Sequence, residues 1–294
     1  MKTFSKKPRA DEGSRRVACV ICAADNAEPY WECGTFRFVR CRSCGHIYQN
    51  PQPQPNALLD RYDSEYSDYE VENSSIFLDL MLKGLNDVGF FARVETDGVD
   101  RSLLDVGCAT GALLEYFRDR GYRVQGVEVC EPAAEYGRSK RGVPIATGTL
   151  DQVDLGEAAS GGRFGGRFGA VHASHVIEHV PDPRAFLRQA HSRVDEGGYL
   201  VIVTPNSAGL QARLFGSEWR SAIADHVHLF SRRNLARLIS ECGFDPVAFK
   251  TWGGLGIGTA PAWLKRPVDR LAKMFGFGDV VLVLARRQGR TGDS

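Results

Sequence analysis

The sequence predicts an α/β protein in which a doubly wound, mostly parallel sheet follows a small cysteine-rich β unit. Two observations carry this prediction. From Arg101 onward, short apolar runs alternate with segments of helix length, a pattern typical of parallel sheets covered by helices. Before that point, five of the eight cysteines fall within the first 44 residues. The 294 residues are enough for one enlarged α/β domain or for two domains.

Composition narrows the possible classes of protein. Hydrophobic residues make up 43% and charged residues 25% of the chain, which excludes a wholly disordered, collagenous or coiled-coil protein. The net charge of +1 argues against a protein that mainly coats nucleic acid or an anionic membrane. No segment approaches the roughly 18 uninterrupted apolar residues of a spanning helix. The basic N-terminus has no apolar stretch behind it, unlike a secretory signal, so we expect a cytoplasmic protein.

The N-terminal cysteines form two close pairs, each with two intervening residues. Two such knuckles present four sulfurs to one tetrahedral metal, and this spacing is typical of a zinc site. Two disulfides are the alternative, but a cytosolic chain keeps its thiols reduced. Cys33 and His46 are possible substitute ligands. The spacing therefore predicts a Zn²⁺ site formed by Cys19, Cys22, Cys41 and Cys44.

Prolines, glycines and charge divide the chain further. Within the cysteine unit, the alternation of FRFVRC predicts a strand. The prolines of QNPQPQPN, which follows this unit, indicate an extended linker. Residues 57–72 are acidic and tyrosine-rich, which fits equally a solvated helical face or a substrate-closing lid. A helix is expected over residues 75–95. The predicted divisions are a flexible arm (1–18), a zinc ribbon (19–50), a linker with a helical lid (51–100) and the sheet domain (101–294), and we expect ribbon and sheet to have separate cores.

Within the sheet domain, hydrophobic periodicity gives the elements. Strands are expected at 102–106, 123–129, 143–147, 168–173, 199–204 and 278–286, and helices at 111–120, 131–140, 183–194, 231–242 and 262–275. Residues 160–169 contain a short GGRF duplication. Such Arg-Gly-Gly sequences can bind RNA, but one short pair of copies between two sheet elements favours a flexible loop.

The segment LLDVGCATG, followed by a helix, is the most informative of the chain. A buried strand, an acid near its end and a glycine turn form a nucleotide-type ligand site at the carboxyl edge of a sheet. Asp105, two positions before Gly107, would repel a pyrophosphate but suits a ligand with an ammonium and a sulfonium. Seventeen positions after Gly111, strand VQGVEV ends in Glu128, which can accept hydrogen bonds from two ribose hydroxyls. S-adenosylmethionine fits this description.

The chain resembles class I S-adenosylmethionine-dependent methyltransferases of the bacterial group with an N-terminal zinc ribbon. The resemblance runs from Cys19 to Arg286 through LLDVGCATG, VEVCEP, ATGTLDQVD, HVIEHVPDP, DEGGYLVIVTPN and DHVHLFSRRNLARLISECGF. It implies a Rossmann-like sheet and cofactor contacts at Asp105, Gly107, Cys108, Gly111, Glu128, Thr149 and Leu150. Two positions depart from the family's common pattern. Thr149 stands where many relatives have Asp, and Gly169 stands where many have Asp at the start of the fourth strand.

Histidines are the candidate bases, because imidazole titrates near neutrality and methyl transfer to a hydroxyl or acidic carbon requires removal of a proton. His172, His175, His179, His226 and His228 are all expected after sheet strands, on the ligand side. His179 and His226 lie in motifs of the resembled family. If HVIEHV is helical, His175, Glu178 and His179 share one face. They could form a base with an orienting carboxylate, a metal site, or a structural cap, and we favour His179 as the base.

Three functions remain open from the sequence. The first is a methyltransferase for a small-molecule acceptor such as a sugar, polysaccharide, quinone-like compound or secondary metabolite. The second is an RNA methyltransferase that uses the ribbon to grip its substrate, which the small net charge disfavours. The third is a non-catalytic module that binds S-adenosylmethionine. Loops of generic chemistry shape the acceptor pocket, so the sequence does not name the acceptor.

Overall fold

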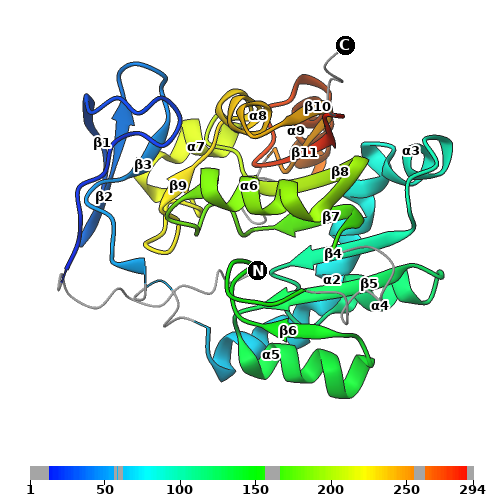
Figure 1. Cartoon of the computed structure of the whole chain (residues 1–294). Coiled ribbons are helices and arrows are strands. Elements are labelled where there is room, and N and C mark those ends of the chain that lie inside the picture. The colour runs from blue at the N-terminus through cyan, green and yellow to red at the C-terminus, as the bar shows by residue number, and fades with distance from the viewer. Residues whose placement is uncertain (1–12, 56–57, 59–61, 156–165, 255–261, 290–294) are drawn as a thin grey trace, which may run out of the picture.

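The computed structural model describes residues 13–55, 58, 62–155, 166–254 and 262–289. Their central feature is a seven-stranded sheet of order β10-β11-β8-β7-β4-β5-β6 (Figure 1). Five strands run parallel, namely β4 (Ser102–Val106), β5 (Arg123–Glu128), β6 (Ile145–Thr147), β7 (Phe168–Ser174) and β8 (Val194–Pro205). β11 (Val280–Arg287) runs antiparallel between β8 and β10 (Phe244–Trp252). The predicted doubly wound, mostly parallel sheet is confirmed.

The helices of the sheet domain follow the predicted order. They are α4 (Ala112–Arg118), α5 (Glu131–Tyr136) with a π-helical extension over Gly137–Arg141, α6 (Pro183–Arg193), α8 (Arg232–Glu241) and α9 (Ala262–Phe275). Asp182 and Ser231 cap α6 and α8, because their side chains accept hydrogen bonds from backbone N–H groups in the first turn. These caps fix where each helix begins.

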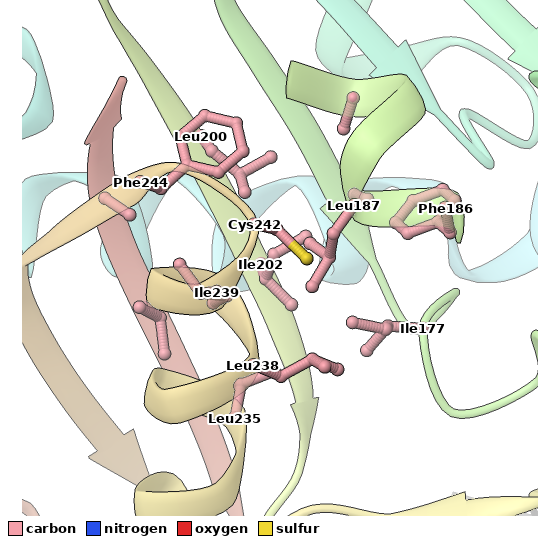
Figure 2. Packing of buried hydrophobic residues seen from close by; sticks show 14 of the residues in the cluster. Ile177, Phe186, Leu187, Leu200, Ile202, Leu235, Leu238, Ile239, Cys242 and Phe244 are labelled. Atoms are coloured by element: carbon pink, nitrogen blue, oxygen red, sulfur yellow. The ribbon is translucent and has the colours of Figure 1, made fainter. Parts of the chain in front are cut away.

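Two hydrophobic clusters cover the two faces of the sheet. On one face, α6 and α8 pack against β8, as Leu187, Leu238 and Leu200 show in Figure 2. Ile177 joins this cluster from the connection after β7. On the other face, α4 contributes Phe117. Burial on both faces explains the continuous apolar run YLVIV in the second half of β8.

The N-terminal unit forms its own antiparallel sheet from β1 (Ala27–Cys33), β2 (Phe36–Cys41) and β3 (Ile47–Gln49). Its fourth strand, β9 (His228–Leu229), comes from the sheet domain. The expectation of separate cores is wrong, because Cys19, Val39 and Tyr48 of the ribbon belong to the same hydrophobic cluster as β8 and α8. The ribbon is therefore built onto the sheet domain.

Several elements differ from the expected boundaries. The helix expected over 75–95 is two helices, α2 (Ser64–Asp87) and α3 (Phe90–Thr96), because Gly89 adopts a left-handed conformation at φ 68° between them. Residues 64–72 of the acidic stretch form the first turns of α2, which Asp63 caps. Sequence analysis missed β10, whose Pro246 interrupts the strand pattern. It also missed β9, α7 (Leu210–Phe215) and the short 3₁₀ turn Gly216–Glu218.

Part of the expected N-terminal arm is ordered against the linker. The backbone of Arg15 pairs with that of Gln52, and Val17 hydrogen-bonds the Asn50 side chain, so these residues lie along the linker. The first twelve residues of the expected arm, and most of the expected loop over 160–169, lie outside the described residues. Among the helices that the structure describes, none has the length and hydropathy that a bilayer span requires.

Candidate functional site

The four cysteines of the two knuckles lie together at the base of the ribbon. Their sulfurs all lie within 4.8 Å of one another, and the Cys19–Cys44 and Cys22–Cys41 sulfur pairs are each 3.5 Å apart. Zn–S bonds of about 2.3 Å would set the sulfurs of a tetrahedral site about 3.8 Å apart. These residues therefore fit Zn²⁺, and the separations are too long for disulfides, whose S–S bonds are about 2.05 Å.

The environment of one thiol, that of Cys41, favours the form that binds metal, whereas burial raises the pKa of Cys19 and raises that of Cys44 to about 11. Burial raises the pKa of Cys41, but hydrogen bonds from the backbone of Cys44 and Ser43 lower it to a net depression. Backbone N–H groups directed at a thiolate stabilise the form that binds metal. Cys33 and His46, the possible substitute zinc ligands, contact other residues. Cys33 Sγ contacts Ser217 O, and His46 Nε2 lies 3.2 Å from His228 Nδ1.

The glycine loop after β4 is shaped by close contacts that exclude side chains. Gly107 has φ 71°, and a Cβ there would lie 2.5 Å from Val176 Cγ2. Gly111 has φ 73°, precedes α4, and would place a Cβ 2.7 Å from Val143 Cγ2. Both positions therefore require glycine. The Gly107 contact also shows that the connection after β7 packs directly against this loop.

Glu128 lies at the end of β5, beside the loop. It is 2% exposed, and its two carboxylate oxygens accept hydrogen bonds of 2.8 Å from the N–H groups of Ala109 and Cys130. Burial raises the pKa of Glu128, against the lowering effect of these hydrogen bonds. The acid is thus held next to the glycine loop, where the sequence predicted a ribose partner.

The other expected cofactor residues surround Glu128. Gly148 N donates to Glu128 O, which brings Thr149 and buried Leu150 to the same edge of the sheet. The Thr149 hydroxyl donates to Asp151, and Cys108 is buried in the loop. Cys130 Sγ contacts Asp63 O, so the N-terminus of α2 lies next to this edge.

Asp105 has a partner that sequence analysis did not anticipate. Its Oδ1 lies 2.7 Å from Nδ1 of His172, the register partner of Asp105 in the neighbouring strand. His172 therefore lies inside β7, and the expectation that it follows the strand is wrong. Its Nε2 is buried and has no hydrogen-bond partner among the described residues. Knowing that β4 and β7 are adjacent parallel strands would have revealed this pair.

The HVIEHV segment is a turn, which corrects the conditional expectation of a helix. β7 ends at Ser174, and the backbone of His175 then adopts a left-handed conformation at φ 56°. A non-glycine residue rarely holds this conformation, and such strain is concentrated at functional sites. The turn directs Ile177 into the core and Val176 onto Gly107. The turn that carries His175, Glu178 and His179 thereby contacts the glycine loop through Val176.

Glu178 is the buried centre of this turn. Its Oε1 lies 3.0 Å from His175 Nδ1, and its Oε2 accepts a 2.9 Å hydrogen bond from the Thr204 hydroxyl. Burial would raise the pKa of Glu178, but the hydrogen bond from His175 and the nearby His179 and His226 lower it to about 2. Glu178 is thus an ionised carboxylate, and Thr204 is a contributor that no sequence signal indicated.

His179 and His226 converge on this carboxylate from two segments. One ligand atom each of Glu178, His179 and His226 lies within 4.8 Å of the others, and the two imidazole rings are 4.7 Å apart. His179 Nδ1 lies 2.8 Å from Asp225 O, and His226 Nδ1 lies 2.8 Å from Ser221 O. Because a carbonyl only accepts, each neutral ring carries its proton on Nδ1, which leaves Nε2 as the basic nitrogen.

The remaining histidine of the expected set lies apart from this cluster. His228 is in β9 and contacts His46 of the ribbon, so its expected position among the ligand-facing groups is wrong. His175 is half exposed and touches Glu178, but it is outside the group formed by Glu178, His179 and His226. The three-residue set that the structure assembles therefore contains His226 in place of His175.

A glycine loop and a buried acid at the carboxyl edge of a parallel sheet define an α/β protein with a nucleotide-type ligand site. Comparison with known proteins gives the family. Residues 81–248 match the model of the methyltransferase domain family, and the chain belongs to that family. Its fold and motifs are those of class I S-adenosylmethionine-dependent methyltransferases.

Relatives and solved structures agree with this assignment. A ubiquinone biosynthesis O-methyltransferase of Pseudomonas paraeruginosa is 30% identical over 115 residues, which are 36% of this chain and 45% of that protein. The enzyme of the same name from Cereibacter sphaeroides is 30% identical over 155 residues, 49% of this chain and 60% of that protein. The chain thus spans about half the length of these curated relatives.

A similar fold is found in 1,6-didemethyltoxoflavin-N1-methyltransferase of Burkholderia thailandensis, solved with 1,6-didemethyltoxoflavin and S-adenosylhomocysteine. The TM-score is 0.53 at 18% identity, over 90% of this chain and 100% of that chain. At this identity the likeness concerns the fold.

Proposed function

We propose that the protein transfers a methyl group from S-adenosylmethionine to a hydroxyl or acidic carbon of a small-molecule acceptor, with His179 as the base. The observation that carries this proposal is the Glu178–His179–His226 cluster, because Glu178 and His179 lie on the segment whose Val176 packs against Gly107. The segment that carries the candidate base thus contacts the glycine loop through Val176. The names of the curated relatives favour a quinone-like or phenolic hydroxyl among the possible acceptors.

The cofactor residues of this proposal are those around the glycine loop. Gly107 and Gly111 allow the left-handed turns that shape this loop, and Glu128 would accept hydrogen bonds from the ribose. Asp105, with His172 behind it, would attract the ligand's positive end, while Cys108, Thr149 and Leu150 line the same edge. When bound, S-adenosylmethionine supplies an electrophilic methyl group.

His179 would act as the base through Nε2. The Asp225 carbonyl holds its Nδ1 proton, so Nε2 presents the lone pair that takes the acceptor's proton. The resulting imidazolium would be stabilised by the ionised Glu178 close by. His226 also lies beside this carboxylate, and the His175 ring hydrogen-bonds to its Oε1 atom. The chain's own groups thus orient the acceptor and remove its proton.

A divalent metal is the competing role for this cluster. Two imidazole Nε2 atoms and a carboxylate are a competent ligand set, and both Nδ1 atoms contact backbone carbonyls as ligating histidines commonly do. We favour the base, because methyl transfer needs no metal and three ligands leave a metal incompletely held. Both roles require the same three side chains.

The cysteines support a reducing compartment such as the cytoplasm. All eight cysteines of the chain are described and unpaired, and four of them form the thiolate cluster, which oxidation would destroy. We accordingly propose that the ribbon contains Zn²⁺ in the cell.

The test is a methyl-transfer screen with isotope-labelled S-adenosylmethionine against phenols and catechols, sugar nucleotides and RNA. We expect label in a small-molecule acceptor and formation of S-adenosylhomocysteine. Label found only in RNA would contradict the small-molecule acceptor and favour an RNA methyltransferase. Tight cofactor binding with no transfer to any acceptor, including whole-cell metabolite extracts, would favour a non-catalytic binding module.

A further inference from the structure

The ribbon reaches the candidate active site through β3. Antiparallel pairing of β3 with β9 aligns Ile47 with Leu229 and Tyr48 with His228. The pairing continues one residue further, where Gln49 N donates to Val227 O at 3.0 Å. Gln49 is 1% exposed, so its side chain lies inside the junction between the ribbon and the sheet domain.

The Gln49 amide is surrounded by backbone carbonyls of a single loop. Its Nε2 donates to Ala224 O at 2.7 Å and to His226 O at 3.0 Å, with Ile223 O at 3.4 Å. Carbonyl oxygens only accept hydrogen bonds, so this environment fixes which end of the amide faces the loop. Both amide hydrogens are therefore used to hold residues 223–226.

The same loop carries the contacts that orient the candidate base. Ala224 O and His226 O flank Asp225, whose carbonyl lies 2.8 Å from His179 Nδ1. Val227 N and His228 N both donate to Glu178 O, which joins the loop to the HVIEHV turn. Displacement of this loop would move the Asp225 carbonyl and the His226 ring together.

We propose that Gln49 is a positioning residue: from the zinc ribbon it fixes the 223–226 loop, and thereby the ring orientation and tautomer of His179. The inference rests on the proposed function for its catalytic consequence, whereas its structural part concerns only the state of the His179 ring. The ribbon then acts on the candidate base through this loop. Cys44 precedes Gln49 by five residues, so the thiolate cluster secures the segment that bears this amide.

The chain offers a matched control three residues away. Gln52 is also 1% exposed, but neither polar atom of its side chain has a hydrogen-bond partner among the described residues. Gln49→Met and Gln52→Met therefore make the same change in one buried segment, with and without loss of the loop contacts. Gln49→Asn, which keeps an amide but shortens its reach, serves if Gln49→Met does not fold.

The experiment measures the nitrogen chemical shifts of the histidine rings in the full, zinc-loaded protein, with His179 assigned by His179→Gln. These shifts report which ring nitrogen carries the proton. We expect His179 to be protonated on Nδ1 in the wild type and in Gln52→Met, and to become a mixture of tautomers in the Gln49 variant. With an acceptor from the screen, turnover of the Gln49 variant should fall about tenfold or more at cofactor affinity within about twofold.

The outcomes separate this inference from the proposed function. An unchanged His179 tautomer in a folded Gln49 variant overturns the positioning role, even if His179→Gln is inactive. A changed tautomer supports the positioning role, even if His179→Gln retains full turnover, a result that would remove His179 as the base. A lower melting temperature with no change in the tautomer would mean that Gln49 is only structural, and it also overturns the inference.

Discussion

At the scale of single residues, Glu178 connects the two halves of the candidate acceptor site. Its carboxylate contacts His175 and Thr204, its backbone carbonyl accepts from Val227 and His228, and the rings of His179 and His226 lie beside it. Because the pKa of Glu178 is lowered to about 2, it is ionised throughout the physiological range. Its charge would stabilise the imidazolium that forms when His179 takes a proton.

We predict that His179→Ala lowers turnover by roughly 100-fold or more with unchanged cofactor affinity, because it removes acid–base catalysis from a site whose ligand loop stays intact. Steady-state kinetics with an acceptor from the screen, and calorimetry with S-adenosylmethionine, measure the two quantities. Glu241→Ala, which removes the exposed partner of Arg184 and Arg237, is the control. Activity that a chelator abolishes and a divalent ion restores, with the ribbon zinc retained, would contradict the base and favour the metal.

Sequence reasoning identified the chemistry of these residues better than their grouping. The two cysteine knuckles, Glu128 and the glycines follow from local spacing, and the structure brings each of these sets together. The group formed with Glu178 and His179 was expected to contain His175, because a helix was assumed there. His175 contacts Glu178, but the third member of the group is His226, which lies 47 residues after His179 and is brought there only by the tertiary fold.

At the scale of elements, β9 joins the ribbon to the sheet domain through a buried histidine pair. His46 Nε2 and His228 Nδ1 lie 3.2 Å apart, and both rings are buried. Burial lowers the pKa of both, that of His228 to about 4 despite the Pro181 carbonyl and Asp182 nearby. In the unfolded chain a histidine titrates near 6.5.

We predict that this pair makes the protein less stable as the pH falls from about 6.5 towards 4, because the unfolded chain takes up protons that the folded rings exclude. His228 alone should contribute about 2 kcal/mol of lost unfolding free energy at about pH 5. Urea unfolding at about pH 7.5 and about pH 5 measures this loss. In His228→Asn, which keeps a polar partner for His46, the loss should be smaller; an equal loss would exclude His228 as its origin.

The ribbon gives a second prediction at this scale: the purified protein contains one Zn²⁺ per chain, because four sulfurs within 4.8 Å of one another suit a tetrahedral metal. Cys19→Ser should lose the metal and lower the melting temperature of the whole chain, since the ribbon shares β9 and a hydrophobic cluster with the sheet domain. Elemental analysis and calorimetric melting check both. Protein purified without chelator that contains no zinc would contradict the site.

Most elements of the sheet domain could be predicted because their apolar periodicity is strong. The ends of β4 and α9 are those expected from the sequence. β9 and β10 were missed, because β9 is only two residues long and β10 contains a proline. Such strands are defined by their partners, which a local pattern does not contain. The division of residues 75–95 depends on a single left-handed glycine.

At the scale of the whole molecule, the ribbon and the sheet domain form one structure around the candidate site. The glycine loop and Glu128 lie at the edge formed by β4 and β5, and the histidine cluster follows β7 in the next position of the sheet. The 223–226 loop, held by Gln49 of the ribbon, closes the cluster from the other side. No local sequence pattern predicts that the ribbon contacts the 223–226 loop, whose Asp225 carbonyl orients the candidate base.

The measurement that tests the central claim most directly is calorimetric titration of the protein with S-adenosylmethionine and with NAD. We predict binding of S-adenosylmethionine that weakens by about 1.5–3 kcal/mol in Glu128→Ala, because two ribose hydroxyls lose a charged acceptor. Glu131 lies three residues after Glu128 and is an exposed partner of Arg138. As a control, Glu131→Ala should bind S-adenosylmethionine as the wild type does. Equal affinities for wild type and Glu128→Ala, or tight binding of NAD in place of S-adenosylmethionine, would contradict the account.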